Sequence, residues 1–334
     1  MNIKIYALST CLLAASMTSQ AQLNKVDALF PGKSSENVDT VAWIKSATLT
    51  VGGNQGILHN WPAGGELASL TLNGVFNGQM NRFYHRHVWS NTLDMNYGLF
   101  YAYSNDFIPR KTDDRIDLTS KYGYRISQKS DFYATLLFNA KTQFSKAYNY
   151  DADNWRDNST SNFLSPLYMT ISPGIEYRQG TKFSLFFSPA AARFTFVDRY
   201  YTNQKEEGAF GVKKGENMRF EVGAYMSARY NTDIVKDVIS YRGRLDLYSN
   251  YLAKDLYDNN FNLIKADNPG NIDIMFDNFI SFKFYKYFSV SVGLTAIYDN
   301  DVPYKKNPDT KDPFSGLGWW QIKQFTAIGF NYKF

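Results

Sequence analysis

The chain has 334 residues and a formal net charge of +5, and aromatic residues make up 17% of it, with 25 Tyr and 26 Phe. Its single cysteine, Cys11, excludes a disulfide or a thiolate metal site, and no Lys/Arg-rich run marks a nucleic-acid surface. A water-soluble core rarely needs so many rings, whereas membrane β-barrels carry aromatic girdles at both interfaces.

Residues 1–21 have the pattern of a cleaved signal peptide. Lys4 precedes an apolar stretch from Ile5 to Met17, and Ser19-Gln20-Ala21 fits a small-x-small cleavage site. Cys11 lies inside this segment, so the mature chain is expected to contain no cysteine. We predict a periplasmic lead-in over residues 22–46 and a single outer-membrane β-barrel over residues 47–334.

From residue 47 onward, apolar and polar residues alternate with a period of two, which predicts a transmembrane, antiparallel, up-and-down β-barrel of about twelve strands. Runs of about ten residues match tilted membrane strands. The polar face carries many full charges, which a dry core would not tolerate unpaired. The candidates for lumen-facing residues are Asp113, Arg115, Asp117, Lys121, Arg125, Arg219, Glu221, Arg242, Arg244, Asp246, Asp273 and Asp277.

The connections between these strands alternate between short and long. Short ones are expected near residues 81–86, 127–131, 179–182, 231–237 and 285–287, and long polar ones near 54–65, 104–110, 145–165, 198–217, 253–270 and 299–318. This rhythm is typical of periplasmic turns and extracellular loops, and an even strand number places both termini in the periplasm.

Pro173 and Pro189 interrupt two neighbouring predicted strands, where a missing N–H breaks the ladder. The hairpin between them turns near Thr181, so the two prolines should lie almost opposite each other. The favoured interpretation is a paired kink or bulge that shapes the wall. The alternative is a weak wall that serves as a lateral opening.

The last predicted strand starts at Trp320 and keeps its aromatic residues in step to the end of the sequence, at Phe330, Tyr332 and Phe334. This ending is similar to the C-terminal signal by which outer-membrane barrels are recognised for insertion. The expected partners are therefore outer-membrane lipid and the barrel-assembly machinery.

Five segments of the chain carry a family likeness: 60–65 (NWPAGG), 111–124 (KTDDRIDLTSKYGY), 183–189 (FSLFFSP), 208–212 (GAFGV) and 246–252 (DLYSNYL). They resemble a family of Bacteroidota outer-membrane proteins, the domain of unknown function 3078 family. The likeness extends over nearly the whole mature chain, except near Trp43, where the family often has a Gly-Gly that is absent here. The resemblance implies a place in the cell envelope and no particular reaction.

The charged inward face allows two interpretations. One is a narrow or gated channel for small polar solutes, with a slight preference for anions because basic residues are in excess. The other is an occluded barrel, stiffened by salt bridges, that works with other envelope proteins. A barrel of this size lies between a filled one and a porin.

An outer-membrane lipid hydrolase is a less favoured alternative. It would need a Ser and a His together on the lipid-facing wall. We expect no histidine inside an alternating strand, because His85 and His87 lie at a predicted turn. No nucleophile elbow, phosphate-binding loop or H-E-x-x-H helix is present, so we predict no enzyme, cofactor or metal site.

Overall fold

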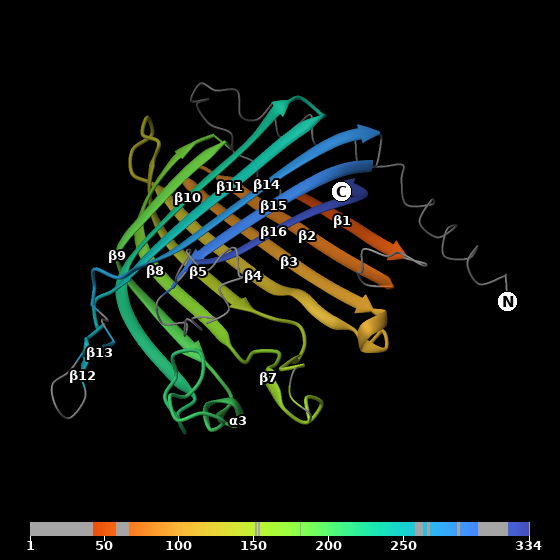
Figure 1. Cartoon of the computed structure of the whole chain (residues 1–334). Helices are drawn as coiled ribbons and strands as arrows, with labels where there is room; N and C mark the ends of the chain where they lie inside the picture. Colours follow the sequence, from red (N-terminus) through yellow and green to blue (C-terminus); the bar gives the residue numbers. More distant parts are fainter. Residues whose placement is uncertain are drawn as a thin grey trace.

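The computed structural model describes residues 43–57, 67–150, 152, 154–180, 182–257, 263–265, 268–285, 288–299 and 320–333. Long antiparallel strands in these ranges form one closed barrel (Figure 1). The barrel strands are β1 (Ile44–Ile57), β2 (Ala68–Tyr84), β3 (His87–Ala102), β4 (Arg110–Arg125), β5 (Phe132–Thr142), β8 (Leu167–Gln179), β9 (Phe183–Phe196), β10 (Met218–Val235), β11 (Ile239–Asn250), β14 (Ile272–Tyr285), β15 (Phe288–Tyr298) and β16 (Trp320–Lys333).

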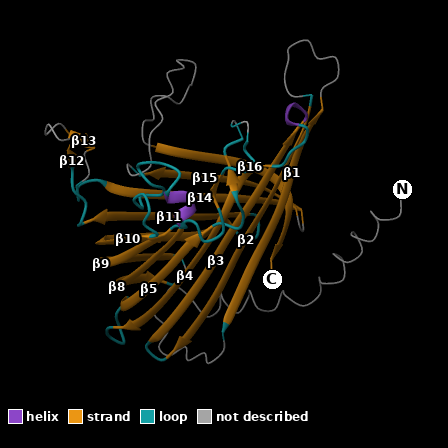
Figure 2. Cartoon of the chain, turned by 90° about the horizontal axis from the view of Figure 1, so that it is seen from below, coloured by secondary structure: helices purple, strands orange, loops and turns teal. Residues whose placement is uncertain are grey.

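Each barrel strand pairs with the next one along the chain, and β16 pairs back onto β1, which it lies beside in both ribbon views (Figures 1 and 2). The prediction of an up-and-down barrel of about twelve strands is confirmed. Shorter elements lie in the connections, and none of the helices in the described ranges has the length and hydropathy needed to span a membrane. These shorter elements are η1 (Tyr103–Asn105), β6 (Ala147–Tyr148), β7 (Ser159–Ser161), α3 (Arg199–Thr202), β12 (Leu256–Tyr257) and β13 (Leu263–Lys265).

The two faces of the barrel wall have the reverse of a soluble protein's polarity. Outward side chains are large and apolar, and Ile175, Phe187 and Phe284 are each more than half exposed. On the inward face, by contrast, Asp117 and Glu176 are each only 1% exposed. A soluble sandwich would bury the apolar face, so this pattern is that of a membrane barrel with lipid outside and polar groups inside.

The two ends of the barrel carry different connections, as the alternation of loop lengths predicts. Short turns join β2 to β3, β4 to β5, β8 to β9, β10 to β11 and β14 to β15. At this end strand residues also bond to neighbouring turns, for example where Asn231 N–H of β10 donates to Lys182 O over 2.7 Å. The other end carries the longer segments with η1, β7 and α3, and we call the two ends the turn end and the loop end.

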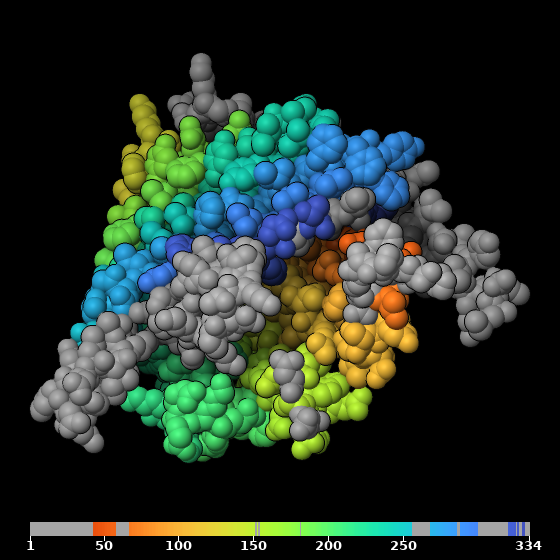
Figure 3. Space-filling model, in the orientation of Figure 1, coloured from red at the N-terminus to blue at the C-terminus, as the bar shows by residue number. Residues whose placement is uncertain are grey.

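β1 closes the barrel, and its pairing with β2 is longer than its pairing with β16. It pairs with β2 along its whole length, from Ile44 to Ile57. Its described pairing with β16 is shorter and joins 48–52 to 329–333. The first strand begins at Ile44, slightly before the expected boundary at residue 47. In Figure 3 the blue strands lie above a hollow in which yellow strands are visible.

The ladder between β8 and β9 is interrupted at the two prolines. Pairing runs from Ile171 opposite Ala192 directly to Ile175 opposite Phe187, so Pro173 and Pro189 lie in an unpaired stretch. β8 still pairs with β5 through Pro173, opposite Leu136. The prolines are exposed on the outward face.

A buried apolar cluster lies on the inner side of this interruption. It comprises Leu137, Phe186, Ala191, Tyr225 and Tyr248. Phe186 packs so closely that a Cβ added to Gly174 would lie 2.9 Å from its ring, and Ser188 Oγ donates to Pro173 O over 2.6 Å. In this conformation the interruption is therefore backed by packed side chains. The paired kink and the lateral opening both stay predictions.

The expectation that no histidine lies inside an alternating strand is wrong for His87. A two-residue turn, His85-Arg86, follows Tyr84, so His87 is already the first residue of β3 and pairs with Tyr84. Its Nδ1 atom lies 2.7 Å from the hydroxyl of Tyr122.

Of the three aromatic residues predicted to form the insertion signal, Phe330 and Tyr332 belong to β16, while Phe334 lies outside the described residues.

Candidate functional site

Ion pairs cross the barrel interior at mid-height. Arg244 on β11 lies 2.8 Å from Asp117 Oδ2 on β4, through its NH1 atom, and 2.7 Å from Asp246 Oδ2 on its own strand. Around the ring β5, β8, β9 and β10 separate β4 from β11. The contact between Arg244 and Asp117 therefore connects walls that face each other across the lumen.

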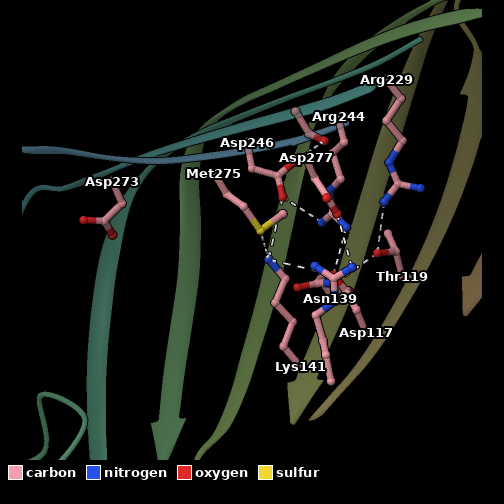
Figure 4. Close-up of polar contacts among 12 residues, drawn as sticks. Asp117, Thr119, Asn139, Lys141, Arg229, Arg244, Asp246, Asp273, Met275 and Asp277 are labelled. Carbon is pink, nitrogen blue, oxygen red and sulfur yellow. Dashed lines mark hydrogen bonds and ion pairs between the residues drawn. The ribbon is translucent and has the colours of Figure 1, made fainter. Parts of the chain in front are cut away.

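Two side chains of β5 complete this group (Figure 4). Lys141 Nζ lies 3.7 Å from Asp246 Oδ2 and 4.0 Å from Asp117 Oδ2. Asn139 donates to Asp117 Oδ1 over 2.6 Å. We call Asp117, Asn139, Lys141, Arg244 and Asp246 the cross-lumen network. Its two carboxylates and two cations balance in charge, as buried ions require.

A second inward group links β3, β4 and β8. Lys121 Nζ lies 2.7 Å from Glu176 Oε1, and Arg178 Nε lies 3.2 Å from Glu176 Oε2. Arg178 also reaches β3, where it donates to Ser90 Oγ over 2.9 Å. Because Lys121 and Glu176 are both almost fully buried, this pair holds neighbouring parts of the wall together on the turn side of the network.

On the loop side of the network, further ion pairs connect separate strands. Arg193 of β9 lies 2.8 Å from Asp273 of β14, and its guanidinium stacks 3.4 Å from the ring of Tyr248. Asp113 of β4 lies 2.5 Å from Lys323 of β16. Arg219 pairs with Glu221 on β10 over 2.8 Å. The interior at this level is therefore occupied by paired charges.

Beside the network the interior holds a cavity of about 110 Å³. Arg115 and Asp277 line it and pair with each other over 3.2 Å. Arg242 also lines it, with its guanidinium 4.9 Å from the ring of Phe279. The last candidate, Arg125, donates to the hydroxyl of Tyr133 over 2.6 Å.

The structure thus brings the sequence-predicted inward residues together in several groups rather than one site. Sequence reasoning missed Glu176, Arg178 and Arg193 as functional candidates. Their parity was readable, since Glu176 and Arg178 alternate with Ile175 and Tyr177, but the prolines obscured the strand. In the described ranges, no three His, Cys, Asp or Glu side chains gather as metal ligands would.

A lipid-facing apolar exterior around this charged interior makes the chain an outer-membrane-type β-barrel. Solved structures of similar architecture include the translocator domain of the autotransporter NalP from Neisseria meningitidis, which is 9% identical, with a TM-score of 0.36 and a match over 94% of this chain and 95% of that one.

Two further solved structures show the same kind of likeness. The COG4313 outer membrane channel from Pseudomonas putida F1 is 10% identical, with a TM-score of 0.35 over 91% of this chain and 98% of that one. A FadL homologue from Pseudomonas aeruginosa is 11% identical, with a TM-score of 0.27 over 86% and 87%. No curated protein matches the sequence.

The sequence itself matches one family model, described as protein of unknown function (DUF3078), over residues 54–148. This match includes 60–65 and 111–124, two of the segments that carry the resemblance noted above. It extends from the end of β1 through β5 to β6, and so includes Asp117, Asn139 and Lys141 of the cross-lumen network. Over residues 54–148 the chain is therefore similar to the DUF3078 family.

Proposed function

We propose that this barrel lies in the outer membrane, with its turn end and both termini in the periplasm, and that it is a gated channel for small polar solutes. The observation that carries the proposal is the cross-lumen network, in which ion pairs rather than apolar packing join β4 to β11. Polar and charged side chains continue on both sides of it, and they would line a path for polar solutes once these pairs separate.

An ionic closure is suited to gating because its contacts are few and specific. The network makes its connection between opposite walls through single guanidinium, ammonium and amide groups, with Arg244 and Lys141 as the cations. A change in charge, local field or barrel shape that separates Arg244 from Asp117 would open this level. The proposed direction of gating is therefore displacement of β11 relative to β4.

Planar-bilayer recording of the purified protein tests this proposal. The wild type should open rarely, and Asp117→Ala/Arg244→Ala should open more often, because this double variant removes the bridge and leaves Lys141 balanced by Asp246. Arg125→Ala is the matched control, since that guanidinium contacts Tyr133 on the adjacent strand rather than an opposite wall. Equal open probability in all three proteins would contradict the gating proposal.

A second candidate is an occluded barrel that works with other envelope proteins. It is favoured by the apolar cluster of Leu137, Phe186, Ala191, Tyr225 and Tyr248, which fills one side of the interior. Absence of conductance over many insertions, for the wild type and the double variant alike, would support this role. Lipid hydrolysis by the pure protein would overturn both candidates, although His87 contacts a tyrosine hydroxyl rather than a serine.

A further inference from the structure

The cavity beside the cross-lumen network contains more positive charge than its carboxylates neutralise. Its ionisable lining side chains are Arg115, Arg229, Arg242, Arg244, Asp94 and Asp277. We propose that this cavity is a binding site for a small oxyanion, held by Arg229 and Arg242. The proposal deepens the proposed function, because it names the solute class, but binding at this site does not require the barrel to conduct.

Two of the four arginines already have carboxylate partners. Arg244 lies within 2.8 Å of both Asp117 and Asp246, and Arg115 lies 3.2 Å from Asp277. These ion pairs neutralise the guanidinium groups of both arginines within the protein. Asp277 also accepts a hydrogen bond from Thr295 over 2.8 Å, which engages its second oxygen.

Arg242 is different, because no carboxylate among the described residues forms an ion pair with it. Its contact is with the ring of Phe279, 4.9 Å from the guanidinium carbon. The nearest acids in the lining are engaged elsewhere: Asp94 accepts from Asn77 over 2.7 Å, and Asp277 accepts from Arg115 and Thr295. Its N–H donors therefore remain available to a ligand in the cavity.

Arg229 is the other arginine of the cavity lining that forms no ion pair with a described carboxylate. It donates to two neutral hydroxyls, Thr92 Oγ1 at 3.1 Å and Thr119 Oγ1 at 3.2 Å. Its Nε atom is buried and has no hydrogen-bond partner. A buried donor without an acceptor costs free energy, so the site is better satisfied when an acceptor is bound.

Strand register brings these two arginines to one place. Arg229 pairs with Arg244 and Asn231 pairs with Arg242 across the β10–β11 ladder, so Arg229 and Arg242 are diagonal neighbours on the same inward face. Long side chains at diagonal positions reach a shared ligand. Asn231 also lines the cavity and adds an amide donor beside them.

The chemistry of this arrangement selects a small oxyanion. Guanidinium groups present planar forks of N–H donors that match the oxygens of phosphate and carboxylate. Against Arg229 and Arg242 the lining holds one further carboxylate, Asp94, so one positive charge remains in excess, which is costly to bury without a counterion. The cavity of about 110 Å³ has room for a small anion, and the inward direction of both arginines places it in the lumen rather than among lipids.

The test is isothermal titration calorimetry of the full-length mature barrel in a zwitterionic detergent at low chloride, with inorganic phosphate as the probe and acetate as a second arm. We expect saturable phosphate binding that weakens about tenfold or more in Arg242→Gln and in Arg229→Gln, since each loses a charge-assisted hydrogen bond. Arg193→Gln is the matched control, because it removes a lumen charge already paired with Asp273 on the loop side, and its affinity should stay within about twofold of the wild type.

A second readout does not depend on the arginine variants. The predicted mature chain has no cysteine, so Asn231→Cys provides a single thiol in the cavity for labelling. Phosphate should slow its reaction with a negatively charged thiol reagent. Phosphate binding that is absent, or unchanged in both arginine variants, would overturn the proposal, as would labelling that phosphate does not slow. Phosphate binding without conductance would overturn the channel proposal and leave the anion site standing. Conductance without phosphate binding would overturn the anion site and leave the channel proposal standing.

Discussion

Removing the charge of Asp117 should destabilise the barrel far more than removing an exposed carboxylate. The Asp117 side chain is 1% exposed, and its two oxygens accept from Arg244 over 2.8 Å and from Asn139 over 2.6 Å. Asp117→Asn keeps the shape but leaves two cations, Arg244 and Lys141, facing Asp246 alone. Removing one member of a buried ion pair costs about 3–5 kcal/mol, and we expect about 3 kcal/mol here.

Glu206→Gln is the matched control on the surface. Glu206 pairs with Lys214, but the two side chains are 88% and 44% exposed, so the variant should lose less than about 1 kcal/mol. Asp117→Asn/Arg244→Gln provides the second comparison. It leaves Lys141 and Asp246, 3.7 Å apart, as a balanced pair, so it should be less destabilised than the sum of its two single variants.

The assay is reversible guanidinium unfolding of the barrel in lipid vesicles, followed by tryptophan fluorescence, with the free energy of unfolding taken by linear extrapolation. The reasoning would be refuted if Asp117→Asn lowered the free energy of unfolding by no more than Glu206→Gln does. Strict additivity of Asp117→Asn and Arg244→Gln in the double variant would also refute it, because independent side chains would then account for both effects.

Three further outcomes follow from the structure. Leu137→Ala, in the apolar cluster at 1% exposure, should cost about 2–5 kcal/mol in the same unfolding assay; Leu136→Ala, its outward neighbour at 51% exposure, should cost about 1 kcal/mol, and equal losses would contradict the assignment of the two faces. Gly174→Ala should lower stability by about 1–3 kcal/mol, because its Cβ would lie 2.2 Å from Phe187 O, and an unchanged free energy would show that β9 shifts freely. Lys213→Cys at the loop end should react with an impermeant maleimide on intact cells and Lys236→Cys at the turn end should not; the reverse pattern would overturn the proposed orientation.

Much of the barrel wall was predictable, because apolar and polar residues alternate along each strand and the alternation can be read directly from the sequence. On β4, the period-two pattern separates Leu118 and Tyr122 from Asp117 and Lys121, and the structure places these on opposite faces. The connection lengths then separated the two ends of the barrel. Both signals are local, since each depends only on a few consecutive residues.

The partners of the inward charges were not predictable in the same way. Arg242 and Arg244 are equivalent in sequence, two residues apart on one face of β11, yet Arg244 pairs with Asp117 and Arg242 pairs with no described carboxylate. The difference depends on which residue of β4 lies opposite at the same height. That is set by strand tilt and stagger around the closed ring, which alternation does not encode.

The short seam between β1 and β16 has a consequence for the backbone at the loop end. In the described ranges, β16 pairs with β1 only up to Gly52, so from Gly53 to Ile57 every second amide of β1 points away from its one partner strand. Amides there should exchange with solvent deuterium well before those in the middle of β2 or β3, because opening them breaks no ladder on that side. Such a free edge is also the template onto which another extended segment adds most readily.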